Sequence, residues 1–286
     1  MGSFVVKSYA KINIALNITS KRADGYHELD MVMLPLKLHD SIQIEKLPGK
    51  KDNFVIMDDF SVFLGDDNIA SHAIDAIDKK VNLKGQKFKV TIHKNIPMQG
   101  GMGGGSSNAA ATLIGINNFM KLNLSTEELL ELSKPLGSDV PFFIYNKPAR
   151  CLGKGEIIKP INIKNNYHVL IIKPDGGCST KEIYSKFDED PKFNICNVDK
   201  VVEALETGDD KLLAESAANA LQDAAIKHLP EIQTIIDMLK AEGLDIVLMT
   251  GSGSTVFAMS TNEKLIKKVA KKYEDKYDLE VTEVIK

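Results

Sequence analysis

Five glycines occupy the six positions 100–105, and Ser106 and Ser107 follow them directly. Glycine lowers the stability of regular structure, because its backbone loses more freedom on folding than that of other residues. A backbone without side chains can also approach an anion closely, and the N–H groups at the start of a helix attract negative charge. Residues 96–116 therefore predict a phosphate-binding loop, in which one of the two serines caps a helix that begins near Asn108. The alternative is a flexible hairpin tip ahead of a buried, alanine-rich helix.

The loop fits none of the common nucleotide-binding fingerprints. Gly105 is followed by Ser-Ser-Asn, whereas a P-loop places Lys and then Ser or Thr after its last glycine. The spacing of Gly101, Gly103 and Ser106 differs from the GxGxxG pattern of dinucleotide-binding folds. The chain also contains neither the HRD nor the DFG tripeptide of protein kinases.

A carboxylate and an amine elsewhere in the chain could complete a phosphoryl-transfer site. Asp139 stands two residues before Pro141, a pattern typical of the first turn of a helix. A helix terminus favours an ionised carboxylate, so Asp139 could also accept a proton from an attacking hydroxyl group. Lys11 lies on the polar face of the strand pattern at 10–18, with Asn13 about 7 Å farther along that face. Its amine could hold the hydroxyl group, or it could be an ordinary solvent-facing lysine.

Tyr26 and His27 follow a tight turn expected at Asp24 and Gly25. A tyrosine ring can stack on a base, and a histidine can hydrogen-bond to the edge of a heterocycle. The pair could equally be packing within the fold. A second small-residue loop, at 250–255, by itself predicts only a connection between two strands.

These residues need a scaffold, and strand and helix patterns alternate along the chain. Strands are expected at 10–18, 41–47 and 88–94, from 167, as a pair within 245–260, and at 279–285. Helices are expected after Asn68, at 125–134, 197–206, 209–224 and 230–242, and from 262. Ser125 and Glu128 predict a capping box, and Pro135 is expected to end that helix. The pattern restarts after residue 155, which predicts two α+β domains, at 1–157 and 158–286.

Composition narrows the class of partner. The 286 residues, 43% of them hydrophobic, can bury a sizeable core. The 36 Lys and Arg residues against 39 Asp and Glu give a net charge of −3, which disfavours nucleic acid and anionic membranes as partners. The lysine-rich helix pattern from 262 has an apolar stripe at Leu265, Ile266, Val269 and Tyr273, so its lysines are expected to form a solvated face.

The cysteines and the hydropathy pattern suggest a compartment. Three cysteines without pairing or metal-ligand spacing favour a reducing environment. No apolar run approaches the ~20 residues of a membrane helix, and no signal-peptide pattern is present. We expect a cytoplasmic protein.

Four segments taken together resemble the signature regions of the GHMP kinase family. They are "YAKINIALNITSKRADGYHEL", "PMQGGMGGGSSNAAA", "LGSDVPFFI" and "TGSGSTVFA", with further matches at 66–73 (DDNIASHA), 153–156 (GKGE) and 174–184 (PDGGCSTKEIY). The ADGYH turn resembles the branch of the family that acts on a cytidyl-linked methylerythritol in the non-mevalonate isoprenoid precursor pathway. The resemblance implies an α+β fold, with an N-terminal ribosomal-S5-domain-2-like domain that binds ATP and a C-terminal ferredoxin-like domain on the substrate side.

The resemblance also implies a reaction and a set of residues. It implies that ATP, with Mg²⁺, phosphorylates the 2-hydroxyl group of the cytidyl substrate, with Asp139 as the catalytic base and Lys11 holding the hydroxyl group. The implied ATP contacts are Asn68, Lys94, Pro97, Met98, Gln99, Gly100, Gly101, Met102, Gly103, Gly104, Gly105, Ser106 and Ser107. The implied substrate contacts are Asn13, Tyr26, His27, Thr180 and Tyr184. The metal ligands stay open, because no acidic residue in these motifs completes a shell around Ser107.

Two alternatives stay open. Another GHMP kinase, of the homoserine or mevalonate type, would share the phosphate loop but have no reason to place Tyr26, His27 and Tyr184 around a base. A nucleotide-binding regulator without turnover is expected to lose Lys11 or Asp139, and both are present. The expected partner is a small-molecule substrate, with neither nucleic acid nor membrane, for a chain that is a monomer or a homodimer.

Overall fold

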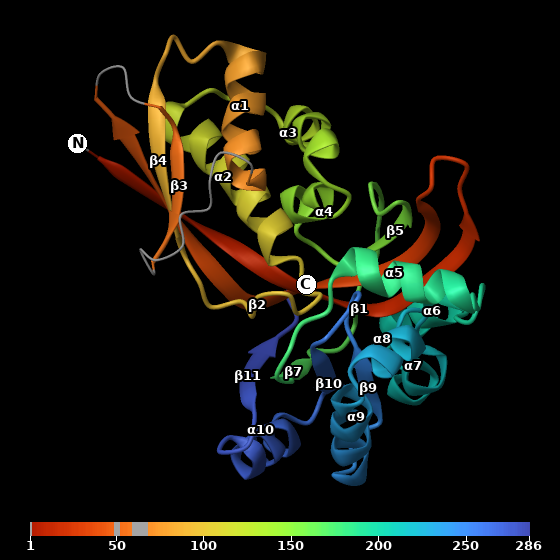
Figure 1. Cartoon of the computed structure of the whole chain (residues 1–286). Helices are drawn as coiled ribbons and strands as arrows, with labels where there is room; N and C mark the ends of the chain where they lie inside the picture. Colours follow the sequence, from red (N-terminus) through yellow and green to blue (C-terminus); the bar gives the residue numbers. More distant parts are fainter. Residues whose placement is uncertain (1, 49–51, 59–67) are drawn as a thin grey trace. The chain divides into compact units, whose positions relative to one another are not determined.

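The computed structural model describes residues 2–48, 52–58 and 68–286 (Figure 1). Its strands are β1 (Ser3–Lys21), β2 (His27–Leu47), β3 (Phe54–Met57), β4 (Lys87–His93), β5 (Ala149–Gly153), β6 (Ile157–Pro160), β7 (His168–Lys173), β8 (Ala218–Asn219), β9 (Ile246–Met249), β10 (Val256–Ser260) and β11 (Asp278–Glu283). Its helices are α1 (Ile69–Val81), α2 (Gly104–Met120), α3 (Thr126–Ser133), α4 (Val140–Tyr145), α5 (Thr180–Glu189), α6 (Val198–Thr207), α7 (Asp210–Ser216), α8 (Gln222–His228), α9 (Glu231–Ala241) and α10 (Glu263–Tyr273), with a 3-10 turn at Lys134–Leu136. Helices and strands alternate in mixed order, which confirms the predicted α+β class.

The chain folds into two compact units. The first comprises the described residues of Met1–Ala10, Leu38–Ile96 and Gly103–Asn146, and the second comprises Lys11–Lys37, Pro97–Met102 and Lys147–Lys286. The long strands β1 and β2 and the glycine loop therefore contribute residues to each unit.

The first unit pairs strands with a helical layer. β3 runs parallel to β4, and β4 runs antiparallel to the second half of β2. Helices α1 and α2 pack side by side, and α3 and α4 pack against α2 (Figure 1). A Cβ atom at Gly115 of α2 would lie 2.4 Å from Cδ1 of Ile44 on β2, so this glycine lets the helix approach the strand. The core lies between these layers.

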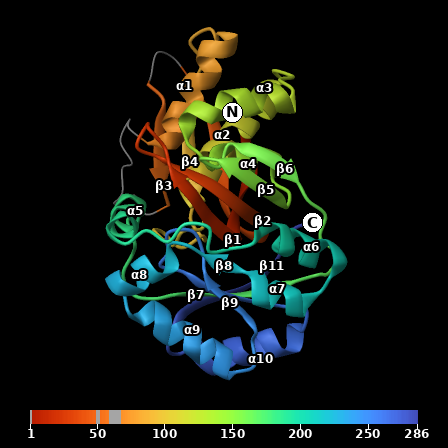
Figure 2. The ribbon, with the colours of Figure 1, turned by 90° about the vertical axis from the view of Figure 1, so that its right-hand side faces the viewer.

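The second unit contains a four-stranded antiparallel sheet in the order β11-β7-β10-β9. Helices α9 and α10 pack against strands of this sheet (Figure 2). In the same unit, the first half of β2 pairs with β5, β5 pairs with β6, and β8 runs parallel to β1. The turn predicted at Asp24 and Gly25 is confirmed, because the amide of Gly25 donates to the carbonyl of Arg22 at 3.2 Å.

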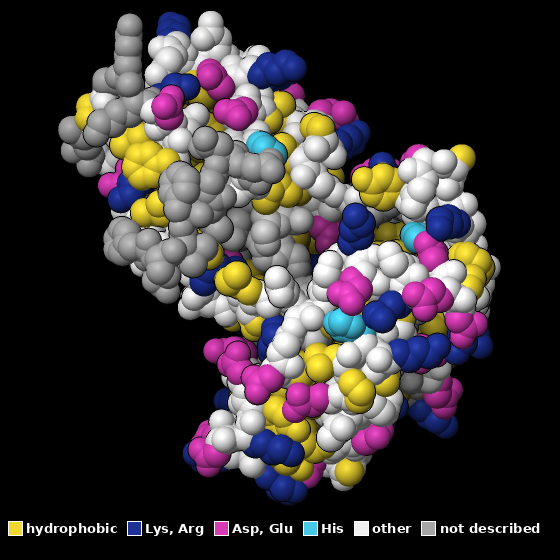
Figure 3. All heavy atoms as spheres, viewed as in Figure 1, with side chains coloured by type: hydrophobic (Ala, Val, Ile, Leu, Met, Phe, Trp, Pro, Cys, Tyr) yellow, Lys and Arg dark blue, Asp and Glu magenta, His cyan; other side chains and the backbone are white. Residues whose placement is uncertain are grey.

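Several local predictions are confirmed. Asn68 is the N-cap of α1, and Ser125 with Glu128 forms the capping box of α3. That helix ends at Ser133, before Pro135. On α10, Ile266 and Val269 are buried and the lysines are exposed, as the apolar stripe predicted. On the face drawn in Figure 3, Lys and Arg side chains lie interspersed with Asp and Glu side chains.

The prediction of one helix over 209–224 is wrong. The chain leaves α7 at Ser216, forms the short strand β8, and starts α8 at Gln222. In β8, Ala218 and Asn219 pair with Ala15 and Leu16 of β1. Strand pairing and a buried side-chain amide therefore override a helical hydrophobic pattern that continues through the segment.

The strand at 10–18 is longer and more buried than predicted. β1 runs from Ser3 to Lys21, and both of its faces are covered from Ala10 to Ile18. The polar residues Lys11, Asn13 and Asn17 are therefore buried, so Lys11 is not the solvent-facing lysine that the sequence left open as one alternative. A period-two pattern separates two faces, but it does not tell which of them meets water.

Candidate active site

The glycine loop enters helix α2 earlier than the sequence suggested. Gly103 is the N-cap, with a φ of 72°, and the helix begins at Gly104 rather than near Asn108. Ser106 and Ser107 lie within the helix, so the prediction that one of them caps it is wrong. Glycine at position 103 adopts the left-handed conformation at no steric cost, which lets the helix start directly after it.

The start of α2 has the properties of an anion site. No side chain caps it, and its first turn contains no acidic residue. The amide of Ser107 makes an intrahelical bond to Gly103 at 2.9 Å, so the preceding amides, from Gly104 to Ser106, lie before the helical ladder. A Cβ atom at Gly105 would find its nearest neighbour 4.0 Å away, at Ile69. This geometry fits a phosphate group.

Gly100 and Gly101 serve a different purpose, because they pack against the second small-residue loop. A Cβ atom at Gly100 would lie 2.4 Å from Oγ1 of Thr255, and one at Gly101 would lie 2.2 Å from the carbonyl oxygen of Thr250. In return, a Cβ atom at Gly251 would lie 2.6 Å from the carbonyl oxygen of Gly101. The loops at 97–102 and 250–255 therefore meet backbone to backbone.

The segment 174–180 joins the same pair of loops. A Cβ atom at Gly177 would lie 2.5 Å from the side chain of Gln99, and Oγ1 of Thr180 lies 3.0 Å from Oγ of Ser252. Thr180 is exposed and opens helix α5. Three of the sequence motifs thus converge in the second unit.

Lys11 and Asn13 lie beside this convergence. The ammonium group of Lys11 donates to Oδ1 of Asn13 at 2.5 Å, and its amide donates to the carbonyl oxygen of Met102 at 3.2 Å. The amide of Asn13 donates to Oγ1 of Thr250 at 3.0 Å. The 4% exposure of Lys11 makes it a buried amine held against the glycine loop.

Asp139 occupies the N-cap position of α4 in the first unit, as the sequence predicted, with Pro141 in the first turn. Its carboxylate does not cap the helix, because its backbone is in the helical region, with φ −88° and ψ −11°. The side chain is half-buried. Its role in chemistry stays a prediction.

Asn68 and Lys94 also belong to the first unit. Oδ1 of Asn68 accepts from the amides of Ala70 and Ser71, each at 3.0 Å, so the side chain orients the start of α1. The ammonium group of Lys94 lies 2.5 Å from Oδ2 of the buried Asp40. The two residues before Asn68 in the "DDNIASHA" segment, at positions 66 and 67, lie outside the described residues.

Two residues predicted to contact a base, His27 on β2 and Tyr184 on α5, lie together, and Tyr26 directly precedes β2. The His27 ring stacks on Tyr184, with centroids 4.9 Å apart, and Nε2 of His27 lies 2.8 Å from Oδ1 of Asp188. Tyr26 is 57% exposed, and the ammonium group of Lys154 lies 4.5 Å from the centroid of its ring. An exposed aromatic ring beside a buried imidazole can receive a heterocycle.

Charges around His27 favour an ionised carboxylate. Burial raises the pKa of Asp188, but hydrogen bonds from Lys21 and His27 outweigh this effect and hold the pKa below its usual value. Cys178, two residues before α5, is buried, and burial followed by the charge of Glu182 raises the pKa of its thiol. Cys178 therefore lacks the low pKa of a reactive cysteine.

Sequence reasoning missed residues that hold the loops in place. Oγ1 of Thr255 lies against the glycine loop and is buried without a hydrogen-bond partner among the described residues. The buried side chain of Asn219 donates to the carbonyl oxygens of Met249 and Gly251, at 2.7 and 2.8 Å. The amide of Met249 donates to Oε1 of Gln222 at 3.0 Å. A polar residue inside an apparently helical run was the only signal for Asn219.

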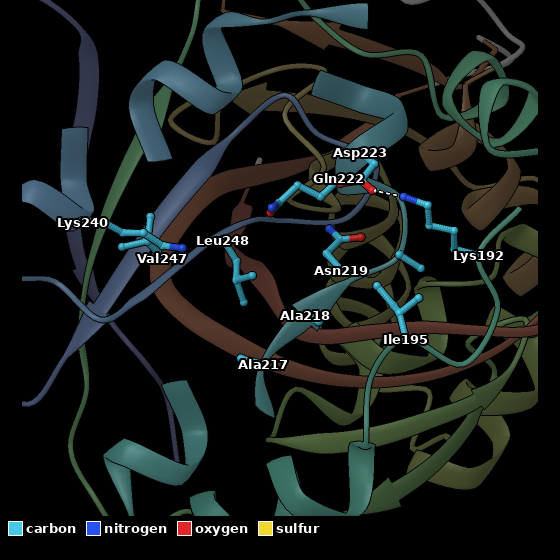
Figure 4. A pocket seen from close by; sticks show the side chains of 11 residues that line it. Lys192, Ile195, Ala217, Ala218, Asn219, Gln222, Asp223, Lys240, Val247 and Leu248 are labelled. Carbon is cyan, nitrogen blue, oxygen red and sulfur yellow. Dashed lines mark hydrogen bonds and ion pairs between the residues drawn. The ribbon is translucent and has the colours of Figure 1, made fainter. Parts of the chain in front are cut away.

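A cavity of ≈250 Å³ lies in the second unit (Figure 4). Asn219, Gln222 and Leu248 line it, together with the ion pair of Lys192 and Asp223 at 2.7 Å. None of the predicted site residues lines this cavity, so it is distinct from the candidate active site.

Residues 2–48, 52–58 and 68–286 contain no group of three His, Cys, Asp or Glu side chains that could hold a metal ion. Mg²⁺ in phosphoryl-transfer sites needs only one or two protein oxygens, because the substrate phosphates and water supply the others. Ser107 is 2% exposed, and its Oγ accepts from Ser8 at 2.8 Å.

Within the same part of the chain, no helix is long and apolar enough to cross a membrane.

Two family models and a series of curated proteins match the chain. The model of the GHMP kinases N terminal domain matches residues 68–147, and that of the GHMP kinases C terminal matches residues 201–279. The chain is 38% identical over 266 residues to a 4-diphosphocytidyl-2-C-methyl-D-erythritol kinase of Geobacillus thermodenitrificans, covering 92% of this chain and 90% of that protein. It is 36% identical over 268 residues to the protein of the same name from Lachnoclostridium phytofermentans, covering 94% and 91% of the two chains.

Solved structures of kinases also resemble the structure of this chain. A crystal structure of 4-(cytidine 5'-diphospho)-2C-methyl-D-erythritol kinase superposes with a TM-score of 0.81 at 26% identity, over 98% of each chain. A homoserine kinase from Cytophaga hutchinsonii superposes with a TM-score of 0.79 at 16% identity, over 100% of this chain and 95% of that chain, and shows the fold alone. The predicted two-domain fold is confirmed.

Proposed function

The chain belongs to the GHMP kinase family, and from this premise we propose that it transfers the γ-phosphoryl group of ATP to the 2-hydroxyl group of 4-diphosphocytidyl-2-C-methyl-D-erythritol. The observation that carries the proposal is the likeness to kinases of that name, at 35 to 38% identity over about nine-tenths of the chain. The reaction places the protein in isoprenoid precursor synthesis by the non-mevalonate pathway.

The proposed mechanism assigns the chemistry to two side chains. The carboxylate of Asp139 takes the proton of the 2-hydroxyl group as the hydroxyl oxygen bonds to the γ-phosphorus, and the bond to the leaving ADP oxygen breaks. The ammonium group of Lys11 holds the hydroxyl group and offsets charge on the phosphoryl oxygens. The hydrogen bond of Lys11 to Asn13 supports this assignment, because it holds the amine in one orientation.

ATP is proposed to lie along the loop from Pro97 to Ser107. The uncapped start of α2 supports a role in binding phosphate, and Asn68 and Lys94 are proposed to contact the nucleoside. Mg²⁺ would enter with ATP and neutralise phosphate charge, with most of its ligands supplied by phosphates and water. The division of the chain at residue 157 into an ATP side and a substrate side remains our proposal.

The cytidine base is proposed to bind at Tyr26, His27 and Tyr184, and the substrate phosphates near Thr180. The stacked rings of His27 and Tyr184, next to an exposed Tyr26, support a site for a planar heterocycle. A homoserine or mevalonate substrate has no base to fill such a site. We propose that the protein acts in the cytoplasm as a monomer or homodimer, with no nucleic-acid or membrane partner.

The test is direct. The protein is incubated with ATP, Mg²⁺ and 4-diphosphocytidyl-2-C-methyl-D-erythritol, and phosphorus NMR follows the product. A new phosphomonoester signal coupled to ADP formation is expected. Homoserine and mevalonate, assayed in parallel by ADP release, serve as controls. Turnover of either alcohol in preference to the cytidyl substrate would overturn the assignment.

A further inference from the structure

Asp40 is a completely buried carboxylate on β2, with 0% of its surface exposed. Its Oδ1 accepts from the backbone amides of Asn95 and Ile96, both at 2.8 Å. Its Oδ2 accepts from the ammonium group of Lys94 at 2.5 Å. A buried carboxylate is costly unless donors converge on it, and these three donors come from consecutive residues just before the glycine loop.

A further donor connects Asp40 with helix α2. In the amide orientation that satisfies its neighbours, Asn108 donates to Oδ2 of Asp40 at 3.0 Å and to Oγ of Ser8 at 2.7 Å. Ser8 in turn donates to Oγ of Ser107 at 2.8 Å. One carboxylate is therefore tied to both the strand end before the glycine loop and the first turns of the helix after it.

The network around Asp40 also fixes the position of Lys94 next to the start of α2. The side chain of Lys94 is 21% exposed, so part of it remains accessible to a ligand. A Cβ atom at Gly104 would lie 3.3 Å from Nζ of Lys94 and 3.5 Å from the side chain of Ile96. The amine thus lies against the first residue of α2, within the proposed ATP site.

We propose that Asp40 is a positioning residue for ATP, which fixes the ammonium group of Lys94 beside the start of α2 without itself touching the nucleotide. This inference rests on the proposed function, because it assumes that ATP binds there. Lysine has a long, flexible side chain that loses rotamer freedom when it binds a ligand. The ion pair with Asp40 removes much of that freedom before ATP arrives.

The test compares Asp40→Asn with the parent protein. Asparagine keeps the shape and one carbonyl oxygen for the two backbone amides, and it turns an NH₂ group, which cannot accept a hydrogen bond, toward Lys94. We expect the equilibrium Kd for a non-hydrolysable ATP analogue, measured by isothermal titration calorimetry, to rise about tenfold, since hydrogen bonds to charged groups are worth that much or more. The KM for ATP should rise by the same factor, while kcat and the KM for the alcohol change less than twofold.

Glu45→Gln is the matched control. Glu45 pairs with Lys89 at 3.1 Å across the same two strands, β2 and β4, so it removes a carboxylate from an ion pair in a comparable place. Its Kd for the ATP analogue should equal that of the parent. Thermal melting of each variant separates a loss of stability from a loss of affinity.

A double-mutant cycle distinguishes positioning from a structural role. If Asp40 acts through Lys94, Lys94→Gln should weaken the analogue about as much as Asp40→Asn, and the double variant should bind no more weakly than either. Additive losses would overturn the proposal, and so would parental affinity in Asp40→Asn. If Asp40→Asn does not fold, Lys94→Gln tests the proposal alone. Parental affinity for the analogue in Lys94→Gln would overturn the proposal, because Lys94 would then make no contribution that Asp40 could support. Failure of the parent protein to bind the analogue would instead remove the proposed function.

Discussion

The ammonium group of Lys11 lies 2.5 Å from the amide oxygen of Asn13, and the two side chains are 4% and 1% exposed. Residues two apart on a strand project from the same face, so the pair shares one buried environment. An amine in such a place needs acceptors, and Asn13 supplies one from a fixed position. The strand thus holds an amine in a defined orientation next to the glycine loop.

Lys11→Ala should lower kcat on the order of 100- to 1,000-fold, because the reacting hydroxyl group loses its positioning contact and the phosphoryl oxygens lose a cation. Single-turnover kinetics with saturating ATP measure the effect on the chemical step. Lys7→Ala, an exposed lysine on the same strand, is the control and should be unchanged. An unaltered single-turnover rate in Lys11→Ala would contradict the assignment.

Asp139→Ala should lower turnover on the order of 100- to 10,000-fold, which is the usual contribution of a general base. Affinity for a non-hydrolysable ATP analogue should stay within about threefold, since the carboxylate acts on the alcohol. Asp75→Ala, on the exposed face of α1 in the same unit, controls for loss of an acidic residue. Turnover within tenfold of the parent would exclude Asp139 as the base.

Gly101→Ala should destabilise the protein and abolish ATP binding. Gly101 has a φ of 74°, and its added methyl group would collide with the carbonyl oxygen of Thr250 at 2.2 Å. Gly243→Ala is the control, because Gly243 has a φ of 82° but nothing within 4 Å of an added Cβ atom. The left-handed backbone destabilises both variants by about 1–2 kcal/mol, and the collision destabilises only Gly101→Ala further. Urea unfolding measures the loss of stability in each variant. Equal losses in the two variants would mean that the close approach of the two loops does not contribute to stability.

Tyr26→Ala should raise the KM for the cytidyl substrate and leave the KM for ATP unchanged. Stacking of a base on an aromatic ring is worth roughly 1–3 kcal/mol, so the expected increase is about 5- to 150-fold. Tyr277→Ala is a matched control, because Tyr277 also carries a lysine over its ring, with Lys276 at 4.8 Å. A rise of the same size in the KM for ATP would contradict the assignment of the Tyr26 ring to the cytidyl substrate.

Alkaline pH should destabilise the protein through Cys196. Burial raises the pKa of this thiol to about 11 from a usual value of 9.0. The folded state therefore favours the protonated thiol, so its stabilising contribution is complete below pH 9 and is lost as the pH rises through 11. A shift of this size corresponds to about 2–3 kcal/mol. Between pH 8 and pH 11, the free energy of unfolding should fall less in Cys196→Ala than in the parent. An equal fall in the two proteins would exclude the Cys196 thiol as the cause.

The sequence predicted the elements whose signals are local. Ser125 with Glu128 set the start of α3, and Asn68 set the start of α1, because caps depend on residues only two or three positions apart. The motifs at 97–107 and 250–255 were also visible, since clusters of small residues have few uses in a chain.

Burial and long-range contacts were not predictable in the same way. The buried state of Lys11 depends on what covers each face of β1, and the break in the helix at 217–221 depends on pairing with that strand. Asp40 gave no signal, because its donors at 94–96 lie more than fifty residues away. These features depend on tertiary context, which overrides local propensity.

The contact between Gly101 and Gly251 consists of main-chain atoms, with no room for a methyl group on either side. An interface of this kind carries no side-chain chemistry that evolution could retune, and it tolerates almost no substitution. The rings of Tyr26 and Tyr184, by contrast, contact other side chains, those of Lys154 and His27. Under the proposed function, a change of these side chains would alter which alcohol is bound and would leave the main-chain contact between the two loops unchanged.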